Sequence, residues 1–475
     1  MIRIMKQHLQ EALKGLSKVV CTKTSLPILS CVRITTGKES VTVSGTDLDQ
    51  WMECQVPAEV AEPMDCIVSL EGLREFIDGG DTRNMVCIAA AGKNIRLSMD
   101  VAGQSMERSL HAMPMDDWPP SKAQPKTMTP VTKDIFGIMK LAYPSASKDD
   151  TRRTLTGICL DKNAVIATDG SQLVKLNFTL PLKEQVILPP TKVLVSGFFK
   201  DDGMMGVVME KKDITHVNFQ SGAWRYTLRC IVANYPNFNQ VIPKDEDLKN
   251  RIVFTAEDIS MLEKSVPKIE GYKDDQQGIV MYAGRNGVKF MSRQPSSSVK
   301  IDTKAEYKGM ETMAAMNRNY VMRALELGFT EFRFCDAYSP FMASGKAGIY
   351  VFMPMRNVRD IESCWKKLGI TPNKEANMSE KKAETAVAGS KAETQPAAPK
   401  TGMQFKPQEQ TTPAADTFEE LRTAAEGIRQ AAKALADSAV IIQRKIADAQ
   451  RAVKLKEKDY KETRDLIERI RAKAA

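Results

Sequence analysis

The residues of this chain that could support catalysis or metal binding do not combine into a known constellation. The stretch TTGKES at 35–40 has the Gly-Lys pair of a phosphate-binding loop. It lacks the earlier glycine at the required spacing and a Ser or Thr directly after Lys38, so a hairpin turn explains it better. The three histidines, His8, His111 and His216, are far apart in the sequence. A zinc site needs three or four convergent ligands, and this spacing does not indicate one.

Two aspartates stand at corresponding places in the chain. Asp47 and Asp169 each follow a predicted strand directly after a threonine. Paired carboxylates could do acid–base chemistry. A repeated turn-capping role explains equivalent positions better, since Asp side chains accept hydrogen bonds from the backbone of tight turns. The sequence therefore predicts no catalytic residue, no metal and no cofactor, and the chain is not expected to be an enzyme.

The composition is that of a protein from a reducing compartment. The chain has 475 residues, 43% of them hydrophobic, and a formal net charge of +9. Its nine cysteines occur singly, which argues against a disulfide framework. The charged residues in the first segment exclude a signal peptide, and no run approaches the roughly 18 apolar residues of a membrane span. We expect a soluble, cytoplasmic protein, without a membrane partner, whose positive charge permits a polyanionic partner without demanding one.

The order of predicted elements recurs along the chain. A helical pattern from Lys6 to Val20 is followed by strands, a second helix and more strands. The order returns from Thr132 and again from Thr255, where Thr255 and Asp258 are spaced as a capping pair. The second helices begin near Ser69, Pro189 and Asn317, a period of about 120 residues. Three unrelated α+β domains would be the alternative to a threefold repeat.

These elements predict an α+β fold with two layers. Two helices laid on one face of antiparallel sheets bury the apolar sides of both. The predicted domains are 1–126, 127–247 and 248–357, followed by a short helix and linker at 358–415 and a helix at 416–475. Two such chains could close a ring under twofold symmetry.

Six local motifs make the pattern specific. They are LPILSCV (26–32), GTDLD (45–49), RRTLTGICL (152–160), ATDGSQL (167–173), NYPNFNQVIP (234–243) and YVFMPMR (350–356). Together they resemble the bacterial DNA sliding clamp, the β subunit of DNA polymerase III, over residues 1–357. The resemblance implies three clamp domains and a head-to-tail homodimer. That ring would enclose double-stranded DNA without reading its sequence and would have no catalytic activity. Its implied partners are the replicative polymerase, the clamp loader and repair polymerases.

The resemblance also implies a cleft between the second and third domains that takes a short peptide of these partners. The matching positions are Leu155, Thr168, Gly170, Leu173, Pro236, Val241, Asn317, Tyr320, Pro340, Val351, Met353, Pro354, Met355 and Arg356. Three positions depart from the family pattern. Ser171 and Gln172 replace a common His-Arg pair, and Gln240 stands where a basic residue is frequent. The expected cleft is therefore less positive than usual.

A positive lining facing phosphates is expected on the helices. The candidates are Lys6, Lys14, Lys18, Lys23, Arg74, Lys133, Lys140, Lys148, Lys192, Lys200, Lys264, Lys268, Arg318 and Arg323. Ordinary solvated helix faces are the alternative for any one of them. The edges expected to close the ring are KIEGYK at 268–273, which is polar, and Met106 to Leu110, which has some apolar character.

The chain continues well past the last clamp motif. DIESCWKKLG at 360–369 predicts a short helix with Ile361, Cys364, Trp365 and Leu368 on one face. A disordered linker is expected up to residue 415, and heptads at 416–475 predict a coiled coil, with a lone solvated helix as the alternative. We expect a sliding clamp whose residues 358–475 are not needed to form the ring. The alternative is a clamp-fold scaffold that tethers partners through the coiled coil without encircling DNA.

Overall fold

The computed structural model describes residues 1–78, 81–120, 124–270, 278–294, 297, 299–356 and 361–369. All of them belong to one compact unit, residues 1–389. The predicted linker and coiled coil lie outside the described residues. So do Gly79 and Gly80, where the sequence predicts an end to the helix that begins near Ser69, and the second half of KIEGYK. No helix in the described part of the chain is long and apolar enough to cross a membrane.

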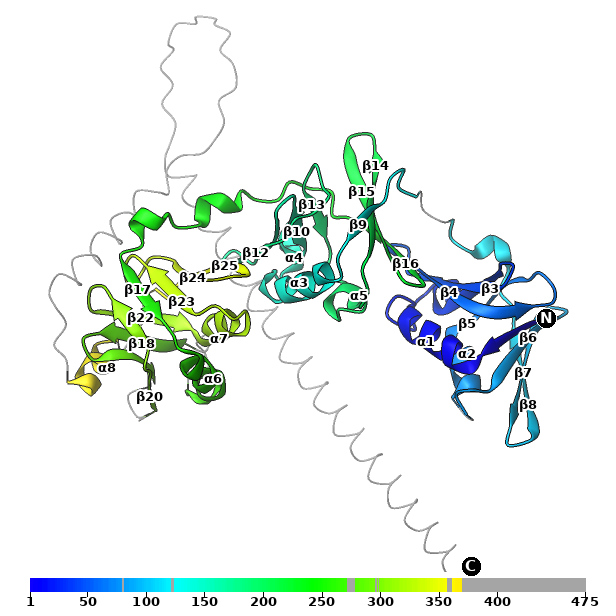
Figure 1. The fold of residues 1–475 in the computed structure, drawn as a ribbon, viewed down its shortest axis with the longest axis horizontal. Helices are drawn as coiled ribbons and strands as arrows, with labels where there is room; N and C mark the ends of the chain where they lie inside the picture. Colours follow the sequence, from blue (N-terminus) through cyan, green and yellow to red (C-terminus); the bar gives the residue numbers. More distant parts are fainter. Residues whose placement is uncertain are drawn as a thin grey trace, which may run out of the picture. The chain divides into compact units, whose positions relative to one another are not determined.

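The first run of elements spans residues 2–111 (Figure 1). It consists of β1 (Ile2–Met5), α1 (Lys6–Leu16), β2 (Cys31–Thr36), β3 (Ser40–Thr46), β4 (Gln50–Val60), β5 (Asp65–Ser69), α2 (Leu70–Ile77), β6 (Met85–Ala91), β7 (Asn94–Val101) and β8 (Gln104–His111). The predicted hairpin at TTGKES is confirmed, because the Gly37 N–H donates to the Ser40 carbonyl at 2.7 Å between β2 and β3.

The second run repeats this order. It consists of β9 (Thr129–Val131), α3 (Asp134–Ala142), α4 (Arg153–Thr156), β10 (Ile158–Asp161), β11 (Ala164–Thr168), β12 (Gln172–Asn177), β13 (Val186–Leu188), α5 (Lys192–Val195), β14 (Gly203–Glu210), β15 (Asp213–Ser221) and β16 (Trp224–Arg229). The helix predicted to begin near Pro189 is reduced to the single turn of α5. Gly197, at φ +60°, lies two residues beyond the end of α5 at Val195, and Phe198 and Phe199 pack in an aromatic cluster with Phe136.

The third run follows the same order again. It consists of β17 (Asn250–Val253), α6 (Ala256–Ser265), β18 (Gly278–Gly284), β19 (Gly287–Ser292), β20 (Lys300–Asp302), β21 (Glu306–Lys308), β22 (Thr312–Asn317), α7 (Arg318–Glu326), β23 (Glu331–Phe334), β24 (Phe341–Gly345) and β25 (Gly348–Phe352), with α8 (Ile361–Leu368) beyond it. The predicted capping pair is confirmed, since the Thr255 and Asp258 side chains each accept from the other's backbone N–H.

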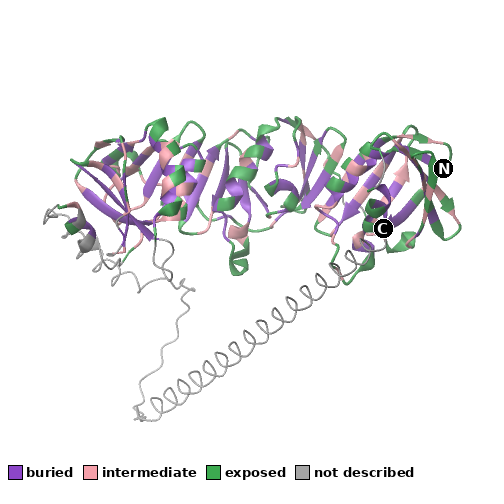
Figure 2. Cartoon of the chain, turned by 90° about the horizontal axis from the view of Figure 1, so that it is seen from below, coloured by how far each residue is buried: buried purple, intermediate pink, exposed green. Residues whose placement is uncertain are grey.

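The strands form antiparallel sheets whose inner faces carry the helices. Each run places its two main helices against each other, α1 with α2, α3 with α5 and α6 with α7 (Figure 1). Side chains between the helices and the sheets form the main core, and the strands are largely buried (Figure 2). The buried stripe of α1 includes Leu9, Leu13 and Leu16, as the helical spacing predicts.

Two strand pairings join the successive runs. Strand β4 pairs with β16, with Gln50 opposite Leu228, and β12 pairs with β25, with Gln172 opposite Phe352. We call these pairings the first and second junctions. In the described part of the chain, β8 and β20 each end the strand order of their sheets.

Candidate functional site

A hydrogen-bonded network organises the turn at the second junction. Asp169 Oδ1 accepts from the backbone N–H groups of Ser171 at 2.8 Å and Gln172 at 2.9 Å. The Gln172 amide Nε2 donates to Asp169 Oδ2 at 2.8 Å. Tyr350, on β25, donates its hydroxyl to Gln172 Oε1 at 2.5 Å. Burial raises the pKa of Tyr350, so its hydroxyl stays protonated and remains a donor.

The first junction contains the same network in different residues. Asp47 Oδ1 accepts from the N–H groups of Asp49 and Gln50, and Gln50 Nε2 donates to Asp47 Oδ2 at 2.6 Å. The Tyr226 hydroxyl donates to Gln50 Oε1 at 2.6 Å. The predicted turn-capping role of the two aspartates is confirmed. Sequence reasoning missed the glutamine and tyrosine partners, although the shared spacing Thr-Asp-x-x-Gln pointed to the glutamines.

The structure brings part of the predicted cleft together. Leu173 lies opposite Thr168 across β11 and β12, and opposite Val351 across β12 and β25. The Met353 N–H donates to the Ser171 carbonyl at 2.9 Å. Leu173 and Val351 are buried in an apolar cluster, whereas Met353 is half-buried and remains accessible.

Other predicted cleft residues surround this centre. The Tyr320 ring lies 6.3 Å from that of Phe352, between ring centroids. Gly170 is exposed, with φ +95°, and a Cβ added there would lie 3.2 Å from Arg152 Nη1. Arg152 is a charged neighbour of the cleft that the motif match did not assign.

The remaining cleft residues differ in accessibility. Pro236, Val241 and Arg356 are exposed, Leu155, Asn317, Pro340 and Met355 are half-buried, and Pro354 is buried. Asn317 is also the N-cap of α7, because its side chain accepts a hydrogen bond from the Asn319 N–H at 2.9 Å.

Most of the predicted DNA-facing cations are accessible. The exposed ones are Lys14, Lys23, Arg74, Lys133, Lys140, Lys148, Lys192, Lys200, Lys264 and Lys268. Lys18 is half-buried, and its ammonium lies 5.9 Å from the centroid of the Phe198 ring.

Three of the predicted cations need correction. Lys6 is only 1% exposed, because it stands three residues before Leu9 on the stripe of α1 that packs against the sheet. Arg323 is 9% exposed, and its guanidinium contacts Ser145 Oγ and Glu326. Arg318 donates to the carbonyls of Pro267 and Ile269, at 2.9 Å each. Lys6 and Arg323 therefore do not belong to an exposed lining. The guanidinium of Arg318 is occupied by hydrogen bonds to nearby backbone carbonyls.

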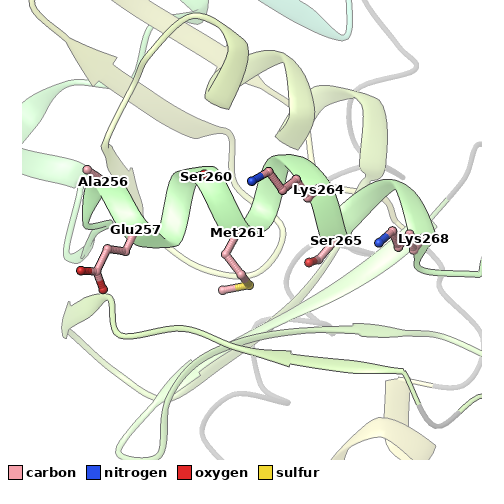
Figure 3. Close-up of a pocket in the computed structure, with 7 residues that line it drawn as sticks. All are labelled: Ala256, Glu257, Ser260, Met261, Lys264, Ser265 and Lys268. Carbon is pink, nitrogen blue, oxygen red and sulfur yellow. The ribbon is translucent and has the colours of Figure 1, made fainter.

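An open hollow runs along α6, lined by Ala256, Glu257, Ser260, Met261, Lys264, Ser265 and Lys268 (Figure 3). Glu257 lies at its start, where it pairs with Lys304 at 3.0 Å, and Lys264 and Lys268 lie toward its end. The hollow holds no convergent acid–base pair, and the described residues contain no cluster of three or more His, Cys, Asp or Glu side chains suited to a metal. The exposed ammonium groups of Lys264 on α6 and Lys268 in the 3-10 turn after it suit contact with phosphates.

Antiparallel sheets joined edge to edge, with paired helices on one face, recur through the described residues. Residues 1–122 match the model of the family "DNA polymerase III beta subunit, N-terminal domain". The chain is 22% identical over 374 residues to the β sliding clamp of Pseudomonas aeruginosa, covering 74% of this chain and 99% of that protein. It is 24% identical over 384 residues to the β sliding clamp of Caulobacter vibrioides, covering 75% and 99%.

Solved structures agree in fold. The Pseudomonas aeruginosa sliding clamp bound to griselimycin superposes with a TM-score of 0.66 at 20% identity, covering 74% of this chain and 98% of that one. The Bacillus subtilis sliding clamp gives 0.66 at 18% identity, covering 75% and 99%. The chain is therefore similar to bacterial β sliding clamps over about three quarters of its length, and about a quarter of it lies outside the match.

Proposed function

We propose that this chain is a DNA sliding clamp, a processivity factor that encircles duplex DNA and tethers the replicative polymerase and repair proteins. Residues 1–126, 127–247 and 248–357 would be its three domains, and it would act without catalysing a reaction. The observation that carries the proposal is the pattern of strand pairing between runs. The fourth strand of one run pairs with the last strand of the next at both junctions, which leaves β8 and β20 for the corresponding pairing between two chains.

The internal junctions predict the register of that third pairing. The Met113, Ile231 and Met355 N–H groups donate to the Ile67, Ile187 and Ala315 carbonyls, which aligns the ends of the three runs. Glu107 then corresponds to Arg225, and Lys300 to Glu53. Arg225 and Glu53 face each other at the first junction in an ion pair of 3.6 Å.

The same alignment predicts the contacts between two chains. Glu107 of one chain would face Lys300 of the other, with the charges exchanged relative to Arg225 and Glu53. Met106 would face Ile301 beside them. An ion pair flanked by an apolar pair is a reasonable cross-strand contact, so the homodimer would close head to tail through these edges.

The exposed cations support a DNA-facing role for the helices. Lys14 on α1, Lys140 on α3 and Lys264 on α6 occupy the exposed sides of helices that pack on the sheets with their other sides. A ring needs only phosphate contacts that do not depend on sequence, and these are sensitive to salt. The ten exposed cations of the predicted set would contact phosphates without fixing the ring at one position along the DNA.

The cleft around Met353 is proposed as the site of the partner peptide. Methionine side chains adapt to different apolar partners, which suits a site that accepts several proteins. Ser171 and Gln172 make this chain's cleft less positive than the family pattern. Arg152, next to Gly170, supplies one cation at the same edge.

The test is retention on DNA of different topology. The full chain would be loaded on nicked circular plasmid and separated by gel filtration in about 0.15 M salt, where weak phosphate contacts are screened. We expect the protein to travel with the circular plasmid and to be lost after a restriction enzyme cuts it. Equal binding to both forms would reject encirclement and favour a scaffold that binds without enclosing DNA.

A further inference from the structure

The helix beyond the last clamp motif is docked on the third run. Cys364 is fully buried and Trp365 is 8% exposed. They lie in one apolar cluster with Val280 and Tyr282 of β18, Met291 of β19, and Met313 and Ala315 of β22. The Trp365 and Tyr282 rings meet edge to face at 6.0 Å between centroids. These sheet residues point away from the main core, so α8 covers the outer face of the sheet.

Each of the other two runs has its outer face covered by the segment that follows its last strand. In the first run, Met113 and Trp118 pack on Ile28, Leu29, Cys31 and Ile67. In the second run, Tyr235 and Phe238 pack in a cluster that includes Cys159, Ile166 and Ile187. Those two covering segments are also the connectors to the next run. In the part of the chain that the structure describes, no further run follows the third, and α8 takes the covering place.

The covering segments of all three runs begin with the same backbone hydrogen bond. Met113 donates to Ile67, Ile231 to Ile187 and Met355 to Ala315, at 2.9, 2.9 and 2.8 Å. Ile67, Ile187 and Ala315 occupy corresponding positions on β5, β13 and β22. Met355 is therefore both the entry to the third cover and a residue of the apolar cluster that Trp365 fills.

We infer that α8 completes the third clamp domain and that Trp365 positions the Met353–Arg356 wall of the partner-peptide cleft. The second part rests on the proposed function, and the first does not. Met355 packs against the apolar cluster that contains Trp365, on the outer face of the sheet. The Met355 and Met353 N–H groups hold the same segment to β22 and to the turn after Asp169. Docking of α8 and binding of a peptide are then linked, each favouring the other. The third domain then continues beyond the proposed boundary at residue 357 and includes α8.

The test uses the full chain and a matched pair of variants on one helix. Trp365→Ala removes the buried ring, and Lys366→Ala alters its exposed neighbour. Docking is followed by alkylation of Cys364 with iodoacetamide, mapped by mass spectrometry. Peptide affinity is followed with a fluorescein-labelled peptide that carries the clamp-binding segment of a bacterial replicative polymerase.

We expect Cys364 to be protected in the native chain and in Lys366→Ala, and to react about tenfold faster or more in Trp365→Ala, because local opening exposes it. Peptide affinity should fall about fivefold in Trp365→Ala, at the lower end of typical coupling. Saturating peptide should slow Cys364 alkylation in the native chain. If Trp365→Ala does not fold, Trp365→Leu, which keeps an apolar side chain, should give smaller changes in the same directions.

The two parts of the inference fail separately. If Cys364 of the native chain reacts as fast as in urea, α8 is not a cover and the inference is overturned. If Trp365→Ala exposes Cys364 while peptide affinity and peptide protection stay unchanged, the positioning role is overturned. If the native chain binds no peptide, the proposed cleft is rejected, and the alkylation result still decides whether α8 completes the domain.

Discussion

The first and second junctions share one hydrogen-bonded arrangement, which we call the frame. They differ in the exposed side chains beside it, which we call the rim. Both are built from an aspartate-capped turn, a glutamine that bonds to that aspartate and a buried tyrosine that donates to the glutamine. The backbone that leaves the last strand is also the same, because Arg229 and Met353 donate their N–H groups to the Asp49 and Ser171 carbonyls. The frame is therefore structural and does not define a site.

The rim side chains separate the two junctions. At the first, Arg229 and Asp49 form an exposed ion pair of 3.3 Å across the rim. At the second, the same two positions carry Met353 and Ser171, which offer an apolar, uncharged surface. Two rim residues on a repeated frame thus replace an ion pair with uncharged side chains, and this is the surface proposed for the partner peptide.

The largest expected effect is on peptide binding at the second junction. Changing both Met353 and Met355 to Ala should weaken the polymerase peptide by about 2 kcal/mol or more, the cost of truncating buried interface anchors. Fluorescence anisotropy measures the affinity, and Arg229→Ala at the first junction is the matched control. Unchanged affinity in the double variant, with the fold intact, would show that the cleft is misplaced.

The next effect concerns the frame itself. Tyr226→Phe and Tyr350→Phe each leave a glutamine oxygen without its buried donor, which should cost about 1–2 kcal/mol in stability. Tyr226→Phe should cost more, because the Tyr226 hydroxyl also contacts Thr191 Oγ1 at 3.0 Å. The shift of the urea midpoint checks this. Loss of peptide binding in Tyr226→Phe would contradict the separation of the two junctions.

A smaller effect is expected at the residue after each aspartate. Gly170 has φ +95°, and its counterpart Leu48 has φ +79°, so the turn needs a left-handed residue in both places. Gly170→Ala should lose about 1 kcal/mol of stability. Leu48→Gly should change little, since relief of about 1–2 kcal/mol of strain is offset by the flexibility of glycine. Strong destabilisation by Leu48→Gly would disprove this reading of the turn.

The smallest effect is a pH dependence. Burial raises the pKa of Asp47 above its ordinary 3.8, against hydrogen bonds from Gln50 and Asp49. The folded state thus holds the Asp47 proton more tightly than the unfolded state. Its stabilising contribution is present below pH 3.8 and is lost as the pH rises through the folded pKa. The stability of the native chain relative to Asp47→Asn should therefore fall over that range.

Asp65 is the matched control for this pH dependence. Hydrogen bonds from Arg33 lower the pKa of Asp65. Its stabilising contribution is present above the ordinary pKa of 3.8 and is lost as the pH falls through the folded pKa. Asp65→Asn should show the opposite slope, and equal slopes for the two variants would refute the assignment.

The repeat and the turns could be predicted from the sequence because they depend on local chemistry. The capping pair Thr255 and Asp258 and the turn role of Asp169 follow from side-chain types and spacing. The burial of Lys6 could not be predicted from its charge, because the position of the residue around the axis of α1 decides whether its side chain faces the sheet or the solvent. The docking of Trp365 depends on an outer sheet face whose residues are far apart in sequence. Its apolar spacing predicted only that the helix must be buried somewhere.

The most direct test of the central claim is a covalent ring on DNA. Glu107→Cys and Lys300→Cys in one chain place two thiols at the predicted contact between chains, and each single substitution is a control for the native cysteines. The double variant would be oxidised in the presence of closed circular plasmid and then denatured in detergent. The account predicts a cross-linked dimer that stays with the circular plasmid and is released by cutting the DNA or by reductant. A dimer that leaves intact circular DNA in detergent, or no cross-link at all, would contradict it.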